Sequence, residues 1–122
     1  MVKYDAPKFC RYRTNAVKDS MTLLTGKWKI HIIGTLLYGG KLCYTDLQNE
    51  ITGIGSKMLS KELQDLELNQ LVTRTVLNTK PITVEYNLTE LGRTLEPTID
   101  AIAQWGIDYR EILFGNKVDP NS

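Results

Sequence analysis

The chain has 122 residues, 42% of them hydrophobic and 24% charged, which is the composition of one globular domain (1–122) and excludes a disordered or fibrous protein. No apolar run approaches the roughly 18 residues of a membrane span, and the N-terminus lacks the apolar stretch of a signal peptide. We therefore expect a cytoplasmic protein with no membrane partner. Two cysteines and one histidine do not complete a four-ligand zinc site, so we expect no metal and no cofactor.

The formal net charge of +1 conceals an uneven distribution. Residues 1–29 hold seven Lys or Arg against two Asp, whereas residues 30–122 hold eight basic residues against twelve acidic ones. The basic end can meet a polyanion, while the acidic remainder limits indiscriminate binding.

The first part of the chain predicts two helices. Thr14 is placed to cap a helix over 14–25, and Gly26 closes it. Residues 27–38 carry an apolar stripe too dense for an exposed helix and stop at a Gly-Gly pair. This second helix is expected at the centre of the core.

Residues 45–88 predict two short helices and a hairpin. Thr45 and Ser56 are placed to cap helices over 45–51 and 56–69, and a glycine-containing turn joins them. Two β-rich segments, 71–77 and 82–88, flank a turn of Asn, Thr, Lys and Pro. This order is typical of a winged helix-turn-helix, a mostly α fold with a small β-hairpin (α+β).

A last helix is predicted over 89–114, with apolar residues every three or four positions. Its stripe covers about six turns, more than one small domain covers, so we expect a partner chain. The N- and C-terminal helices, 14–25 and 89–114, would then form a dimer interface. Its predicted residues are Val17, Met21, Leu95, Ile99, Ile102, Trp105 and Tyr109.

The helix over 56–69 is the expected recognition helix. Its leucines fall on one face, while hydroxyl, amide and lysine side chains fall on the other, where they suit a major groove. The hairpin tip can approach a phosphate or the minor groove. A solvated helix face and an ordinary hairpin turn are the alternatives. The predicted DNA contacts are Thr45, Ser56, Lys57, Ser60, Lys61, Gln64, Asn78, Thr79 and Lys80.

Several strings occur here in the order that is typical of one family. They are Leu24-Thr25-Gly26-Lys27-Trp28, Tyr44-Thr45-Asp46-Leu47, Ile54-Gly55-Ser56-Lys57-Met58-Leu59, Leu63-Gln64-Asp65-Leu66-Glu67 and, above all, Val84-Glu85-Tyr86-Asn87-Leu88-Thr89-Glu90-Leu91-Gly92. From Cys10 to Trp105 the chain resembles the HxlR family of winged-helix regulators, within the MarR-like group. The resemblance implies a homodimer formed by the first and last helices, a palindromic operator in double-stranded DNA and control of neighbouring genes.

The same resemblance suggests a role for Cys10, which stands where many members keep a cysteine ahead of the first helix, used by some as a redox or electrophile sensor. Three positions depart from the pattern. Arg11 replaces the usual proline after that cysteine. Cys43 replaces an arginine, which leaves Lys41 as the nearest substitute for a phosphate contact. Gln70 replaces a glycine between the recognition helix and the wing, and a neighbouring asparagine would have to supply the left-handed residue.

For several individual side chains a structural role is the alternative to a functional one. Basic neighbours would favour the Cys10 thiolate and its reaction with oxidants or electrophiles, and the alternative is a solvent-facing or interface thiol without a signalling role. Cys43 suits a buried core filler, with a pair to Cys10 as the other reading. His31 has no companion acid or nucleophile. The aromatic residues Trp28, Tyr86, Trp105 and Tyr109 would either pack in the core and dimer or line a pocket for an unidentified effector.

These patterns predict a DNA-binding transcriptional regulator that works as a homodimer through the 56–69 helix and the 71–88 wing. No Gly-rich phosphate loop, acid pair or nucleophile elbow occurs, so we expect no enzyme. The alternative is a winged-helix interaction module without sequence-specific DNA binding, which a weak salt dependence of DNA affinity would favour.

Overall fold

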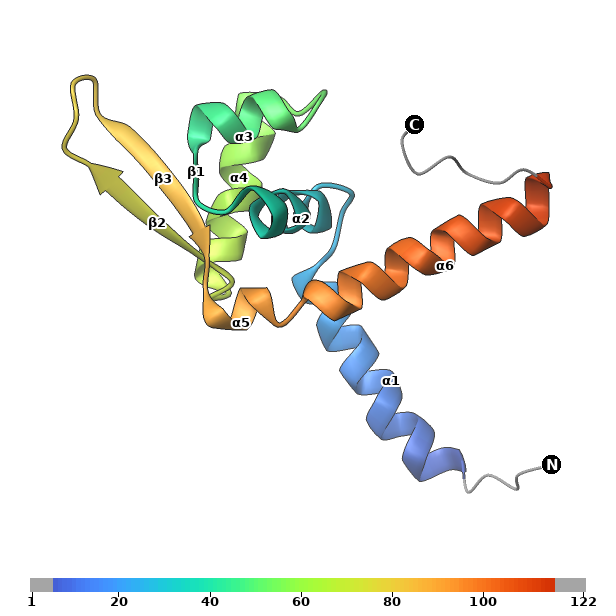
Figure 1. Ribbon diagram of the computed structural model, residues 1–122. Helices are drawn as coiled ribbons and strands as arrows, with labels where there is room; N and C mark the ends of the chain where they lie inside the picture. Colours follow the sequence, from blue (N-terminus) through green and yellow to red (C-terminus); the bar gives the residue numbers. More distant parts are fainter. Residues whose placement is uncertain (1–5, 116–122) are drawn as a thin grey trace.

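The computed structural model describes residues 6–115, with side chains from residue 10 onward, and it confirms the predicted fold class. A winged helix-turn-helix body carries two long helices that project from it (Figure 1). The elements are α1 (Ala6–Leu23), α2 (Lys29–Gly39), β1 (Leu42–Cys43), α3 (Tyr44–Glu50), α4 (Ser56–Leu68), β2 (Val72–Leu77), β3 (Thr83–Leu88), α5 (Glu90–Arg93) and α6 (Glu96–Phe114).

The core lies where α2, α3, α4 and the base of the sheet meet. As predicted, α2 is central, with Ile32, Ile33 and Leu36 fully buried. Leucines at helical spacing on α4, among them Leu59 and Leu63, close the other side of this cluster. Burial of these aliphatic side chains fixes the orientation of α4 and therefore decides which of its faces meets solvent.

The sheet has three antiparallel strands in the order β1-β3-β2. The hairpin pairs Val72 with Leu88 at its base and Leu77 with Thr83 near its tip. The short β1 was not predicted, because two residues are too few to show an alternating pattern. It pairs Leu42 with Tyr86, which ties the entry of α3 to the wing.

The connection from α4 to the wing corrects one expectation. Gln70 itself takes the left-handed conformation, with φ 64°, whereas Asn69 has φ −89°. The amide of Gln70 donates to the Glu67 carbonyl (3.0 Å) and the amide of Leu71 donates to the Leu66 carbonyl (2.9 Å). This pair of bonds is a Schellman motif, which favours glycine at the position that Gln70 occupies.

The predicted single helix over 89–114 is wrong, because the chain breaks into α5 and α6. Thr89 caps α5 as expected, its hydroxyl oxygen accepting the Gly92 amide at 2.9 Å. Pro97 is the second residue of α6. Its ring would collide with the carbonyl four residues earlier, that of Arg93, and α5 ends at that residue.

Three predicted helix starts are also corrected. Helix α1 begins at Ala6 and runs through Thr14, with Pro7 in its first turn, where a missing amide costs nothing. Cys43 occupies the cap position of α3, so Thr45 lies inside that helix. Gly55 occupies the cap position of α4.

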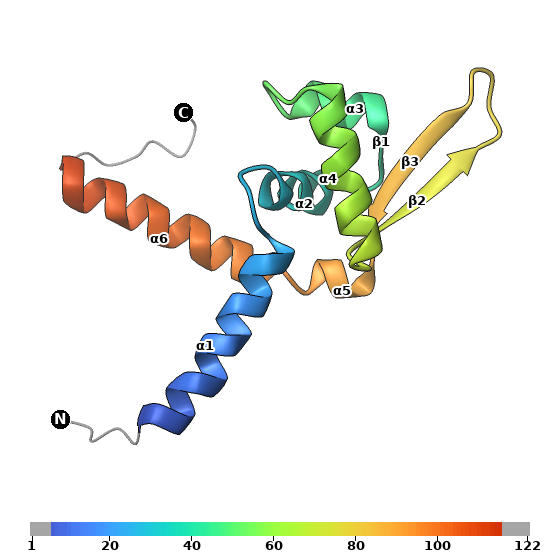
Figure 2. The ribbon, with the colours of Figure 1, turned by 180° about the vertical axis from the view of Figure 1, so that it is seen from behind.

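Helices α1 and α6 extend away from the body like two diverging arms, as views from opposite sides show (Figures 1 and 2). Every residue of α1 from position 11 to 23 is exposed, and α6 has no buried residue. Two predicted interface residues at the start of α6, Leu95 and Ile99, are partly buried and pack against the core of the same chain. Exposed apolar side chains nevertheless follow both arms. They are Tyr12, Val17, Met21 and Leu23 on α1, and Ile102, Trp105, Ile107, Tyr109, Ile112, Leu113 and Phe114 on α6.

Candidate nucleic-acid interface

Helix α4 is anchored to α2 by an ion pair inside the protein. Lys29 Nζ lies 2.8 Å from Glu62 Oε2 and 3.3 Å from Asp65 Oδ2, and the side chains of Lys29 and Glu62 are 8% and 6% exposed. Burial alone lowers the pKa of Lys29, but the hydrogen bonds and charges of the two carboxylates outweigh it and raise that pKa above 10.5. The hydrogen bond from Lys29 is also the main cause that lowers the pKa of Asp65, with Lys61 adding to the effect.

The face of α4 opposite the core carries the predicted recognition residues, and all of them are exposed. The side chains of Lys57 and Gln64 form no hydrogen bond or ion pair within residues 6–115, so they are open to a ligand. Lys61 differs, because its ammonium group lies 3.5 Å from Glu62 and 3.4 Å from Asp65. Part of its charge is therefore already satisfied within the helix.

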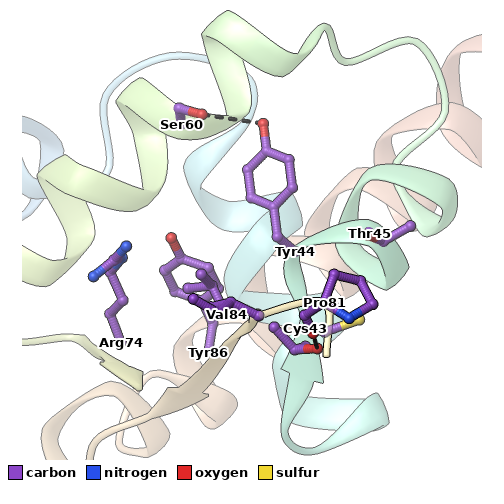
Figure 3. A pocket seen from close by; sticks show the side chains of 10 residues that line it. Cys43, Tyr44, Thr45, Ser60, Arg74, Pro81, Val84 and Tyr86 are labelled. Carbon is purple, nitrogen blue, oxygen red and sulfur yellow. Dashed lines mark hydrogen bonds between the residues drawn. The ribbon is translucent and has the colours of Figure 1, made fainter. Parts of the chain in front are cut away.

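Tyr44 links α3 to the start of α4. Its hydroxyl donates to the Ser56 carbonyl at 2.8 Å and lies 3.0 Å from Ser60 Oγ (Figure 3). Its ring packs against the core. Ser60 therefore has a partner inside the protein, which the sequence pattern did not indicate.

A groove runs between α4 and the wing, and it contains a cation that the sequence reasoning missed. Arg74 projects from β2 and Tyr86 from β3 toward α4, with Ser60 and Gln64 on the facing helix (Figure 3). Arg74 is exposed and makes no ion pair within the described part of the chain. The sequence could have indicated this residue, because Arg74 is the one basic residue of the strand over 72–77.

The remaining predicted contacts are distributed around this groove. Thr45 is exposed and lines it. Lys41 lies 3.8 Å from Glu85, a loose ion pair that leaves the lysine accessible. At the wing tip, Asn78 and Lys80 are exposed. The Thr79 hydroxyl instead donates within the turn, to the Pro81 carbonyl at 2.8 Å, and lies 2.9 Å from Thr83 Oγ1.

Neither cysteine forms a disulfide. Cys10 is half-buried within α1 rather than ahead of it, because that helix starts earlier than predicted. Cys43 is half-buried beside the groove. In both views the start of α1 lies at the far end of a projecting helix, whereas strand β1 lies within the body (Figures 1 and 2). A pair between these cysteines within one chain does not fit this arrangement.

The four aromatic residues do not share one site. Tyr86 belongs to the core and Trp28 packs against it, whereas Trp105 and Tyr109 stack on exposed α6 with ring centroids 5.1 Å apart. His31 is exposed and stacks on Trp28. Within residues 6–115 no three His, Cys, Asp or Glu side chains gather to hold a metal ion. In the same range, no helix has the length and apolar character that crossing a membrane requires.

The geometry defines a winged helix-turn-helix protein in which one face of α4 and the wing are exposed. Residues 23–113 match the HxlR-like helix-turn-helix family, and the chain belongs to that family of transcriptional regulators. It is therefore not an enzyme. The resemblance drawn from the sequence strings is confirmed.

Relatives and solved structures agree with this assignment. The HTH-type transcriptional regulator YdzF of Bacillus subtilis is 34% identical over 98 residues, which cover 80% of this chain and 90% of YdzF. The reduced form of the redox regulator HypR superposes with a TM-score of 0.74 at 33% identity, covering 83% of this chain and 99% of HypR. The reduced form of the transcriptional regulator YodB from B. subtilis gives 0.68 at 29% identity, covering 82% and 94% of the two chains.

Proposed function

We propose that this regulator is a homodimer that binds a palindromic operator, with α4 in the major groove and the wing against the flanking backbone. The observation that carries the proposal is the exposed face of α4, where Lys57 and Gln64 have no partner within the described chain. A lysine near the start of a recognition helix meets phosphates or guanine, and a glutamine reads adenine. Ser56 shares this face at the helix start.

Two cations extend the same surface across the groove and the wing. Arg74 faces α4 from β2, and Lys80 is exposed at the wing tip. A guanidinium group suits bidentate phosphate binding. These residues would add affinity and register, whereas the α4 side chains would read the base sequence.

Dimerisation through the two arms is supported by their exposed apolar faces. Trp105 is 67% exposed and Met21 49% exposed, although both side chains are large and apolar. Most of the stability of a protein helix such as α1 comes from the packing of an apolar face against another surface. A second copy would cover these faces by an isologous interface and would present two α4 helices to successive major grooves.

A redox response through Cys10 is part of the proposal. Two similar structures support this part of the proposal: HypR is a redox regulator, and one structure of YodB is quinone-bound. Cys10 lies on the arm proposed for dimerisation, so its modification can change the separation of the two recognition helices. Diamide treatment should then release DNA from the wild type and from Cys43→Ser, but not from Cys10→Ser.

The DNA proposal is tested with a duplex enriched by the wild-type protein from a random pool. Lys57→Ala/Lys61→Ala should stay dimeric and bind more weakly, and the slope of log affinity against log salt should fall by about 0.9 for each phosphate that the variant no longer neutralises. Lys18→Ala/Lys27→Ala removes the same charge outside α4 and the wing, so it serves as the control. Equal affinities of the two double variants would contradict the recognition-helix assignment and favour an interaction module.

A further inference from the structure

We infer that Tyr44 determines which bases Ser60 accepts, by holding the Ser60 hydroxyl as a hydrogen-bond acceptor toward the major groove. This inference rests on the proposed function, since it requires α4 to enter that groove. It concerns the two hydroxyl groups that lie 3.0 Å apart beside the groove between α4 and the wing (Figure 3).

The first step is a count of protons. A tyrosine hydroxyl has one proton, and Tyr44 donates it to the Ser56 carbonyl at 2.8 Å, an oxygen that can only accept. The bond between the two hydroxyls then needs Ser60 as its donor. With its single proton given to Tyr44, Ser60 retains only lone pairs for an external ligand.

The second step is to ask whether Ser60 has another arrangement. Helical hydroxyls commonly donate to the carbonyl four residues earlier, and Ser20 and Thr35 do so here at 3.0 and 2.8 Å. For Ser60 that carbonyl belongs to Ser56, which already accepts the Tyr44 proton as well as the helical amide. The carbonyl has two lone pairs, so Tyr44 closes this alternative.

The third step concerns the bases. In the major groove, cytosine presents an N4 amino donor and adenine an N6 amino donor, whereas thymine and guanine present a keto acceptor at the corresponding place. An acceptor-only Ser60 favours the amino bases. A transition, adenine to guanine or cytosine to thymine, exchanges donor for acceptor at nearly the same point. Binding the keto base would require Ser60 to give up its bond to Tyr44.

The test uses a duplex enriched by the wild-type protein from random DNA, and every base pair of one half-site is then changed by a transition. For the wild type we expect one position near Ser60 where the amino base is preferred, by about five- to tenfold, the worth of one hydrogen bond. Ser60→Ala should lose this preference. Tyr44→Phe should bind the selected duplex within about threefold of wild type, yet its preference at that position should fall to about twofold or less.

Tyr38→Phe is the matched control, because it removes a tyrosine hydroxyl that binds Asp100 on α6, outside this groove. Thermal unfolding shows whether Tyr44→Phe is folded. If Tyr44→Phe does not fold, Ser60→Ala tests the same contact, because Ser60 is exposed. Selective binding with an unchanged transition profile in the variants overturns this inference alone. Absence of any selective binding by the wild type overturns the proposed function, and this inference with it.

Discussion

Replacing Lys29 with methionine tests the ion pair that anchors α4, the proposed recognition helix. The substitution removes the ammonium group 2.8 Å from Glu62 and leaves a carboxylate that is 6% exposed without its closest cation. Breaking a buried pair in this way costs about 3–5 kcal/mol, a large part of the roughly 5–15 kcal/mol that stabilises a typical domain. At this chain length the midpoint of thermal unfolding should fall by roughly 10–20 °C.

Two further variants separate charge from packing. Lys29→Met/Glu62→Leu replaces both partners by apolar groups, and most of the stability that Lys29→Met lacks should return. Lys61→Met removes an exposed cation from the same carboxylates and should cost less than about 1 kcal/mol. All variants are compared by thermal unfolding at one protein concentration, because the proposed dimer would make the midpoint depend on concentration. A Lys29→Met protein as stable as Lys61→Met would refute the reasoning.

The pH dependence of this network has a defined sign. Asp65 has a lowered pKa. Its contribution to the free energy of unfolding is therefore present above the usual pKa of 3.8 and is lost as pH falls through the lower native value. Lys29 has a raised pKa, so its contribution is complete below 10.5 and is lost as pH rises through the higher native value. In Lys29→Met the alkaline loss should disappear, and the acid loss that Asp65 causes should become smaller, because its native pKa then lies closer to 3.8.

Four other outcomes follow from the structure. Gln70→Gly should raise stability by about 0.5–1 kcal/mol in chemical denaturation, because it relieves a left-handed residue with φ 64°. Gly92→Ala should lower it by more than about 2 kcal/mol in the same assay, because a Cβ there would overlap a backbone carbonyl of the loop before β2. Trp105→Ala should shift sedimentation toward the monomer, since this side chain is 67% exposed in one chain. Lys57→Ala should weaken DNA binding more than Lys61→Ala in fluorescence anisotropy, because Lys61 is already paired within its own helix.

The helix-turn-helix and wing were predictable because their signals are local. The spacing of Leu59 and Leu63 indicates the buried face of α4, and the turn residues around Pro81 indicate the hairpin. The break between α5 and α6 was also readable from Pro97, but the apolar period that continues across it favours one long helix. Capping residues misled the prediction of α1, since Thr14 is compatible with a helix interior.

The anchoring of the site was not predictable, because it depends on contacts between distant residues. Lys29 and Glu62 are 33 positions apart, and nothing in the sequence near either one indicates the pair. The bond between Tyr44 and Ser60 likewise requires the packing of α3 against α4. Arg74 was missed because the hairpin tip has the stronger local signal, although the hairpin register turns this arginine toward α4.

The central claim is sequence-selective DNA binding through α4, and the most direct measurement is the affinity for the protein's own upstream intergenic DNA against a scrambled duplex. Reduced wild type and Lys57→Ala/Lys61→Ala are compared by anisotropy across a salt series. The structure predicts that the wild type prefers the intergenic duplex at every salt concentration, with a steep salt slope that is shallower in the variant. Equal affinity for both duplexes, with one slope for both proteins, would contradict it.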